Sequence, residues 1–466
     1  MRKLWIAGIL LAFLHQPLHA QRVCGNDFTR AAIIKKDPSF AERIYKQRGE
    51  LQGVSDKYYQ KQKDNLQKTT AAAPIPFIFH VIISSARLAN IGGPAGVAQR
   101  CVSQIETLNE DYNRENGDST LIPSGWKSLY ASTGIRYGLA HTDPSGRGTA
   151  GWEIKISDSL FQLGDFSDYG KAKYDTTGGL NAWDVNKYLN IWCIYFSDFP
   201  SLLGVSTPYS FTVSGVGSIP DNQRGVCVAY NAFGKRAAST DNYFSLGINY
   251  ADRGRTLTHE LGHFFELWHT WGDDFGYCPW ESGGSDDGIA DTPPESDHQY
   301  GNPVYNISGG TIYDGCRVNS NTGALMQPKG IPCLDFMDYT DDVAMHMFTT
   351  AQAGVVAAMA AGESLSLTQH PALLDWPLYV PDLSVDNVDI FPNPATGMVH
   401  ISFSGTGTEL QEVVVRNVVG QQVYKSAVGN VKNGIFSINL EGLVKGIYFV
   451  TCNFVSGNVT KKILLL

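Results

Sequence analysis

The sequence predicts an α+β domain followed by a small all-β sandwich, and three observations lead to this fold class. Residues 74–361 alternate between strand-like and helix-like segments, which is typical of one major sheet with helices packed on it. A linker-like stretch follows at 373–386. From 387 to 466 the pattern changes to short alternating strands broken by Gly, Asn and Pro, which indicates an Ig-like sandwich of about eighty residues.

The composition limits the class of protein. The chain has 466 residues, enough for two or three domains, and its 43% hydrophobic and 17% charged content is that of a globular protein with a substantial core. The formal net charge is −9 and no run of Lys or Arg occurs, so we expect no nucleic-acid partner. Eight cysteines are too few for a disulfide scaffold in a chain of this length.

Residues 1–20 have the pattern of a secretory signal peptide. Arg2 and Lys3 precede the apolar stretch Leu4–Leu14, and Leu18-His19-Ala20 is a plausible cleavage site. A membrane anchor is the weaker interpretation, because this apolar stretch is too short to cross a bilayer of about 30 Å. We therefore expect a secreted mature protein without a membrane span.

The remaining elements can be taken in chain order. Residues 21–73 form a polar leader that is rich in Lys and Gln. Buried strands are expected at 74–85, 134–141, 188–196 and 225–233, since these runs are rich in β-branched and aromatic residues. Helices are expected at 96–115, from 253 onward and at 350–361, with a long Gly/Asp/Pro-rich loop at 272–333.

The stretch HELGHFFELWH, residues 259–269, carries the clearest chemistry. On a helix, His259 and His263 are four residues apart and share a face, so both imidazoles can bind one metal ion. Glu260 lies beside that face, where it can act as general base toward the attacking water. This is the spacing of a zinc-dependent hydrolase, and a helix with two scattered histidines is the alternative.

His269 can join the other two imidazoles only if the helix ends before it. In a continuous helix, His269 would lie about 9 Å beyond His263 along the axis and off the face. The spacing His-Glu-x-x-His-x-x-x-x-x-His is the metzincin arrangement, in which a glycine normally makes the turn. Glu266 occupies that position here, and a left-handed turn at a non-glycine residue costs on the order of 1 kcal/mol. A second possibility is that Glu266 itself is the third ligand.

The stretch LTHELGHFFELWHTWG resembles the zinc helix of the pappalysins, a metzincin family of metalloproteases, and CLDFMDYTDD (333–342) resembles their methionine turn. The resemblance covers about 74–372 and implies a metzincin catalytic domain, a twisted mixed sheet with a zinc-binding helix and a backing helix. It implies Zn²⁺ as the cofactor and protein or peptide substrates. Met337 would lie under the imidazoles, and Tyr339 would donate its hydroxyl to the oxyanion.

The resemblance implies further site residues. In the loop DDGIADTPP (286–294), the oxygens of Asp287, Asp291 and Thr292 would offer a possible Ca²⁺ site, and a solvated acidic loop is the alternative. Cys278 and Cys333 match a family disulfide. This leaves Cys316 free or differently paired, and the pairing of the remaining cysteines, Cys101, Cys193, Cys227 and Cys452, open.

Two acids after the methionine turn bear on specificity. By the same resemblance, Asp342 would lie in the pocket for the residue after the scissile bond and favour Arg or Lys there. An exposed acidic pair formed with Asp341 is the alternative. The segment 225–233 is our candidate for the edge strand that holds the substrate as an added strand.

Cys24 suggests a latent precursor. The stretch RVCGND (22–27) resembles the Cys-Gly motif of pro-segments in related proteases, so residues 21–73 would be a pro-segment whose Cys24 thiolate ligates the zinc of the zymogen. An inert thiol or a disulfide is the alternative.

The C-terminal region, 387–466, resembles the sorting domain of proteins exported by the type IX secretion system. The motifs are IFPNPATGMVHI, GIYFV and the terminal KKILLL. The resemblance implies the type IX secretion machinery as a partner and export through the periplasm to the cell surface or medium. The function expected overall is that of a secreted zinc endopeptidase, and the alternative is a surface binding or adhesion protein on a catalytically silent metzincin scaffold.

Overall fold

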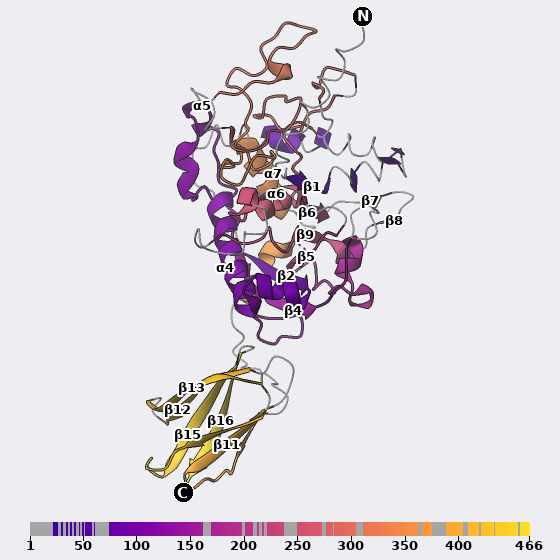
Figure 1. Ribbon diagram of the computed structural model, residues 1–466. Coiled ribbons are helices and arrows are strands. Elements are labelled where there is room, and N and C mark those ends of the chain that lie inside the picture. Colours follow the sequence, from indigo (N-terminus) through magenta and orange to yellow (C-terminus); the bar gives the residue numbers. More distant parts are fainter. Residues whose placement is uncertain are drawn as a thin grey trace, which may run out of the picture. The chain divides into compact units, whose positions relative to one another are not determined.

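The computed structural model (Figure 1) divides the chain into two compact units, one of residues 1–144 and 149–375 and the other of residues 145–148 and 376–466. It describes parts of 22–60 and then the following ranges: 74–161, 169–197, 201–207, 212–213, 217–218, 221–236, 249–272, 276–282, 284–303, 311–361, 366–374, 388–403, 409–418, 421–432, 434–454 and 457–466. The predicted signal peptide lies outside the described residues. None of the helices described is long and apolar enough to cross a membrane.

The first unit contains the predicted mixed sheet, in the order β1-β6-β9-β5-β2-β3, with β4 also paired to β2. All pairs are parallel except β6 with β9. The strands are β1 (Val23–Cys24), β2 (Ile75–Ile83), β3 (Tyr137–Leu139), β4 (Trp152–Ile156), β5 (Leu189–Ile194), β6 (Leu202–Thr207) and β9 (Gly225–Ala229). A separate hairpin pairs β7 (Thr212–Val213) with β8 (Gly217–Ser218). Every residue of β2 is buried, as expected for a strand covered on both faces.

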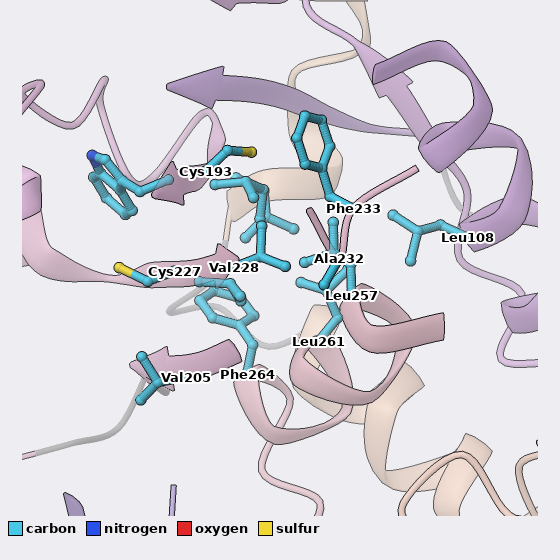
Figure 2. Close-up of a cluster of buried hydrophobic side chains, with 14 of the residues drawn as sticks. Leu108, Cys193, Val205, Cys227, Val228, Ala232, Phe233, Leu257, Leu261 and Phe264 are labelled. Carbon is cyan, nitrogen blue, oxygen red and sulfur yellow. The ribbon is translucent and has the colours of Figure 1, made fainter. Parts of the chain in front are cut away.

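Helices pack on this sheet, and the main ones lie where the sequence predicts them. They are α3 (Ser85–Asn90), α4 (Gly93–Tyr112), α5 (Ser124–Lys127), α6 (Arg255–Phe264) and α7 (Thr350–Ala361). A proline in the first turn of α4 suits a helix start, because its missing N–H would have no partner there. Figure 2 shows Leu257, Leu261 and Phe264 of α6 beside Val205 and Val228 of the sheet. This core fixes α6 against β6 and β9.

The prediction that segment 225–233 is the edge strand that holds the substrate is wrong. Its strand, β9, is interior, because β6 pairs antiparallel on one side and β5 parallel on the other. The catalytic domain's own edge strand is β6, to which the leader strand β1 adds in parallel. The order of strands in a sheet depends on where the chain reverses direction. An entirely apolar segment does not show whether its strand lies at an edge or in the interior.

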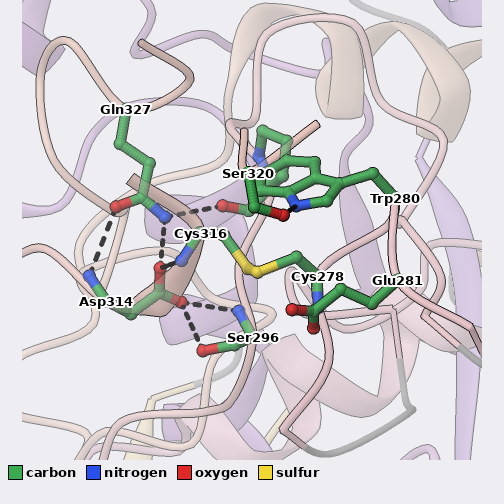
Figure 3. Close-up of a disulfide and its surroundings, with 9 residues drawn as sticks. Cys278, Trp280, Glu281, Ser296, Asp314, Cys316, Ser320 and Gln327 are labelled. Atoms are coloured by element: carbon green, nitrogen blue, oxygen red, sulfur yellow. Dashed lines mark hydrogen bonds between the residues drawn. A yellow bond between two sulfur atoms is a disulfide. The ribbon is translucent and has the colours of Figure 1, made fainter. Parts of the chain in front are cut away.

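The expected Cys278–Cys333 disulfide is also wrong. Cys278 is bonded to Cys316 (Figure 3), with a Cα–Cα distance of 5.4 Å. Cys333 is a buried free thiol. Asp314 accepts the Cys316 amide at 2.8 Å, and Gln327 donates to Asp314, so this turn presents Cys316 to Cys278. Cys101, Cys193, Cys227 and Cys452 take part in no disulfide.

The second unit is the predicted β-sandwich. Its two antiparallel sheets are β10-β11-β14 and β13-β12-β15-β16, and one apolar cluster is shared between them. The strands are β10 (Val388–Phe391), β11 (Met398–Phe403), β12 (Glu409–Asn417), β13 (Gln422–Lys432), β14 (Gly434–Asn439), β15 (Gly446–Phe454) and β16 (Gly457–Leu465). In β15 buried positions alternate with more exposed ones, which is the period of a strand with one face in the core.

A buried lysine fixes the far end of the edge strand. Lys173 is fully buried, and its Nζ donates to Thr207 Oγ1 at the end of β6 (2.8 Å) and to the carbonyl of Gln223. It also lies 4.8 Å from the centre of the Trp192 ring. Burial disfavours the charged ammonium and lowers the pKa of Lys173 to about 8.

This pKa predicts a pH-dependent stability. Between about pH 8 and the ordinary lysine pKa of 10.5, the unfolded chain binds more protons than the folded one, so the free energy of unfolding increases as pH rises through that window. Lys173→Met should remove this contribution, at most about 3 kcal/mol by linkage. Urea unfolding of both proteins at pH 7 to 10 measures the difference, with the exposed Lys171→Met as control. An identical pH dependence in all three proteins would contradict the assignment.

Candidate active site

The turn after α6 directs the third histidine back to the first two. Glu266 has φ of +70°, the left-handed conformation predicted for this position. The Glu266 amide donates to the carbonyl of His263 (3.0 Å), and the Leu267 amide donates to that of Gly262 (2.9 Å). These two bonds are the Schellman pattern that ends a helix at a left-handed residue. The chain therefore reverses within two residues of α6.

The three imidazoles meet at one point. Nε2 of His263 lies 3.2 Å from Nε2 of His259 and 3.0 Å from Nε2 of His269, and the third distance is 3.2 Å. Nδ1 of His259 donates to the carbonyl of Phe336 (2.7 Å), and Nδ1 of His263 donates to that of Leu267 (2.8 Å). In a neutral imidazole that donates from Nδ1, Nε2 carries a lone pair. At least two lone pairs therefore face the same point.

A zinc ion fits this donor set. With Zn–N bonds of about 2.0–2.1 Å in a tetrahedron, ligand nitrogens lie about 3.3 Å apart, close to the observed distances. Burial, and then the neighbouring His263 and His269, lower the pKa of His259 well below its usual value, which keeps the ring neutral for ligation. The alternative ligand Glu266 is not part of the converging group, whose members are Cys24 and the three histidines, with ligand atoms within 4.8 Å of one another.

Glu260 lies between the metal-ligand group and the edge strand. It is 1% exposed, and its Oε2 accepts from the Cys24 thiol at 3.6 Å. A Cβ at Gly204 of β6 would come within 2.6 Å of the Glu260 side chain, so only glycine leaves room for the carboxylate there. The sequence analysis did not identify Gly204, since nothing in the sequence shows which strand passes Glu260.

Met337 lies under α6, as the methionine-turn prediction requires. It is fully buried, and a methyl group on Gly262 would overlap with its sulfur. The turn is held by Asp335, which accepts the Met337 amide (2.8 Å) and the Gln352 amide group (3.0 Å). Burial raises the pKa of Asp335 to about 7.

Tyr339 stands beside the imidazoles. Its ring centre lies 4.9 Å from that of His269 and 5.9 Å from that of His259, and the Trp271 ring lies 4.8 Å away. The Tyr339 hydroxyl accepts a hydrogen bond from the Cys24 amide at 3.3 Å. The hydroxyl is thus directed at the chain that crosses the site.

The leader segment crosses the site as strand β1. Cys24 is 1% exposed, and a Cβ at Gly25 would lie 2.7 Å from the Val205 side chain, so the glycine lets the leader approach β6 closely. The Gly25 amide donates to the Gly204 carbonyl (2.7 Å), and Asn26 Oδ1 accepts the Ser206 amide (2.9 Å). These contacts hold the Cys24 side chain beside the three imidazoles.

Asp342 is buried and paired with the leader. Arg22 Nη1 lies 2.8 Å from Asp342 Oδ1, and both side chains are almost fully buried. Asp342 Oδ2 accepts the amides of Arg253 (2.8 Å) and Arg255 (3.1 Å), just before and at the start of α6. The exposed acidic pair considered as the alternative is therefore wrong. Arg22 was missed, although it precedes Cys24 by two residues.

The three residues of the possible calcium site do not form one group. Thr292 Oγ1 donates to both carboxylate oxygens of Asp287 at 2.8 Å, whereas Asp291 accepts the Ala351 amide (3.0 Å) at the start of α7. The sequence analysis missed a second acidic pair in this region, Glu295 and Asp338. Burial, and then Asp338, raise the pKa of Glu295 well above its usual value.

Comparisons with known proteins relate two parts of the chain to known families. A family model described as pregnancy-associated plasma protein-A matches residues 173–361, and one described as secretion system C-terminal sorting domain matches 389–465. An extracellular metalloprotease of Colletotrichum graminicola is 28% identical over 60% of this chain and 74% of its own length. Another from the same fungus is 35% identical over 21% of this chain and only 28% of its own length.

Two solved structures extend the likeness. Mature mirolysin of Tannerella forsythia in complex with a cleaved peptide is 28% identical, with a TM-score of 0.50 over 67% of this chain and 99% of that chain. A promirolysin variant from the same bacterium is 26% identical, with a TM-score of 0.53 over 78% of this chain and 99% of that chain. The fold, the histidine cluster and these relatives define a metalloendopeptidase. Within that class, residues 173–361 match the pappalysin family model, and residues 389–465 match that of the secretion system C-terminal sorting domain.

The contact between α6 and the methionine turn can be tested by overpacking it. Gly262→Ala should push against Met337 and lower the free energy of unfolding by about 1–3 kcal/mol. Denaturant unfolding measures this loss, and zinc content reports whether the imidazoles still converge. Gly125→Ala is the matched control, because no atom lies within 4 Å of its added Cβ. Equal stability of the two variants would mean that Met337 does not pack against α6.

Proposed function

We propose that this chain is a zinc endopeptidase secreted as a latent precursor, which prefers Arg or Lys immediately after the scissile bond. The single observation that carries this proposal is the path of the leader, whose Arg22 pairs with Asp342 while Cys24 lies at the three imidazoles. One short segment thus blocks the metal site and fills a buried acidic pocket beside it. A surface binding protein on a silent scaffold is the alternative, but binding alone would require neither the buried Glu260 nor Tyr339.

The order of these two contacts fixes the direction of a substrate. The leader reaches Asp342 first and the metal site second. In a substrate whose basic residue follows the cut, the scissile carbonyl at the metal comes before the residue in the Asp342 pocket. The substrate must therefore run opposite to the leader. Because the leader is parallel to β6, the substrate adds to β6 as an antiparallel strand.

The chemistry follows from the side chains around this path. His259, His263 and His269 would hold Zn²⁺, which acts as a Lewis acid toward water and the scissile carbonyl. Glu260 takes the proton from the attacking water and later delivers it to the leaving amine. Tyr339 donates its hydroxyl to the developing oxyanion. Release of the leader uncovers both Glu260 and Tyr339, since Cys24 contacts each of them.

Two further features belong to the proposal. Residues 1–20 direct the chain into the periplasm, and the type IX secretion machinery recognises the sorting domain and exports the protein.

Calcium in the acidic loop is supported by buried carboxylates: Glu295 and Asp338 each have a side-chain oxygen without a hydrogen-bond partner, and a dication would relieve their repulsion. The set of calcium ligands would then include Glu295 and Asp338 in addition to the expected Asp287, Asp291 and Thr292.

Glu260→Gln should lower kcat/KM at least about 100-fold, because the amide cannot accept the proton. Zinc content should stay at one ion per chain. Peptide hydrolysis by the processed enzyme, with and without a chelator, measures the effect. The control is Glu106→Gln on the exposed side of α4. Undiminished hydrolysis by Glu260→Gln would exclude it as the general base.

Cys24→Ala should make the precursor active before the leader is removed. The change deletes the thiol at the metal site, and Arg22 alone does not cover the imidazoles. The initial rate of peptide cleavage by freshly isolated precursor measures latency, with electrophoresis to show that the chain is intact. Cys101→Ala, a buried thiol on α4, is the control and should stay latent. If the Cys24 variant is as silent as the unchanged precursor, the thiol does not maintain latency.

Asp342→Asn should abolish the preference for a basic residue after the cut. Removing the buried charge takes away a charge-assisted pair, so we expect the ratio of kcat/KM for Arg over Gln at this position to fall roughly tenfold or more. Matched fluorogenic peptides that differ only at this residue give the ratio. The neighbouring Asp341→Asn is the control and should keep it. An unchanged ratio in the Asp342 variant would move the specificity pocket elsewhere.

A further inference from the structure

The leader makes a third contact with the catalytic domain, at an aromatic side chain. Trp268 lies between the left-handed residue Glu266 and the metal-site residue His269. The guanidinium carbon of Arg30 lies 3.5 Å from the centre of the Trp268 ring. Cations within about 6 Å of an indole face are attracted by its quadrupole, and a planar guanidinium can also stack on it. Trp268 thus presents a ring face to a cation of the leader.

This ring is held by the catalytic domain itself. Its neighbour Leu267 donates its amide to Gly262 (2.9 Å) and accepts from Nδ1 of His263 (2.8 Å). On its other side, the ring of His269 stacks on Trp271 with centres 4.3 Å apart and planes 5° apart. The backbone on either side of Trp268 is therefore fixed by contacts that do not involve the leader and that persist after the leader is removed.

The position of Arg30 along the leader shows which part of a substrate would reach Trp268. The leader contacts Asp342 through Arg22, then the metal site through Cys24, and only afterwards Trp268 through Arg30. A substrate that runs in the opposite direction passes these places in reverse order. Its residue near Trp268 then precedes the scissile bond.

The turn after Cys24 limits the distance between the metal site, which Cys24 contacts, and Trp268, which Arg30 contacts. The Thr29 amide donates to the Gly25 carbonyl (3.0 Å), and a bond between residues four apart is that of one helical turn. Six residues with a helical rise cover about 9 Å, which an extended substrate spans with about three residues. The second to fourth residues before the cut are therefore within reach of the ring.

We propose that Trp268 forms a subsite for a cationic substrate side chain, Arg better than Lys, two to four residues before the scissile bond. The leader occupies this subsite with Arg30, just as it fills the Asp342 pocket with Arg22. The inference rests on the proposed function, because the direction of the substrate follows from the role given to Asp342. It makes the enzyme selective for peptides with basic residues on both sides of the cut.

The test uses the processed, zinc-loaded enzyme and paired fluorogenic peptides. All peptides carry Arg after the cut, and each pair differs only by Arg or citrulline at the second, third or fourth residue before it. Citrulline keeps the size and hydrogen-bonding groups of Arg but lacks the charge. We expect kcat/KM to favour Arg about fivefold at one of these positions, mainly through a lower KM. Equal values at all three positions overturn the inference without any variant.

Two variants connect the effect to the ring. Trp268→Leu should reduce the Arg/citrulline ratio to about one, whereas Trp268→Tyr should keep part of it, since tyrosine also binds cations through its ring face. A ratio within one enzyme is independent of any general loss of activity caused by disturbing His269. A preference that survives in Trp268→Leu assigns the subsite to another residue and overturns the inference.

The outcomes also separate this inference from the proposed function. An enzyme that cleaves before Arg but is indifferent to citrulline at all three earlier positions overturns only the Trp268 subsite. A zinc-loaded protein without any peptide hydrolysis overturns the proposed function and the subsite together. In the precursor, Arg30→Gln should speed the appearance of activity relative to Arg30→Lys, which retains a cation. Equal rates for these two precursors would also contradict the subsite.

Discussion

The left-handed turn at Glu266 is the constraint on which the metal site depends. Without it, His269 would continue along the axis of α6 and point away from His259 and His263. The turn costs on the order of 1 kcal/mol for a residue other than glycine. Zinc affinity in structural sites is roughly 10 kcal/mol, so ligation by three imidazoles far outweighs this cost. The two Schellman hydrogen bonds keep the reversal in place before any metal is bound.

The proposed latency would use the same side chains as the proposed catalysis, but with the leader running in the opposite direction to a substrate. Tyr339 accepts a hydrogen bond from the Cys24 amide, whereas catalysis requires it to donate to a carbonyl oxygen. Glu260 accepts from a thiol in place of a water. A segment that runs parallel to β6 therefore contacts both Tyr339 and Glu260 through Cys24.

Much of this site could be predicted because its information is local. The spacing of His259, Glu260, His263 and His269 predicts the helix, the reversal and the common metal site, and CLDFMDYTDD marks Met337 and Tyr339. The errors concern contacts between distant segments. Strand 225–233 is apolar whether it lies at an edge or in the interior, so its place depends on where β6 inserts. Likewise, Cys278 could pair with Cys316 or Cys333, and the choice depends on how Asp314 orients the turn at Cys316.

One short helix, α6, connects the proposed specificity pocket with the proposed catalytic groups. At the N-terminus of α6, the amide of Arg255 and the preceding amide of Arg253 bind Asp342, where the helix dipole also favours an anion. Burial opposes the charge on Arg255, but Asp111 and Asp118 outweigh it and raise the pKa of the guanidinium. The Arg255 side chain forms its ion pairs with Asp111 and Asp118, and its Nη1 also donates to the backbone carbonyl of Asp342 (2.8 Å).

The middle of the same helix carries the two imidazoles and Glu260, and the turn at its end presents Trp268. The amides that bind Asp342, the two helical histidines with His269, and the aromatic ring thus follow one another within residues 253–269, and the leader contacts Asp342, the metal site and the ring. A displacement of α6 would change them together. The packing of α6 against β6, β9 and Met337 therefore determines the spacing between the subsites as well as the geometry of the metal site.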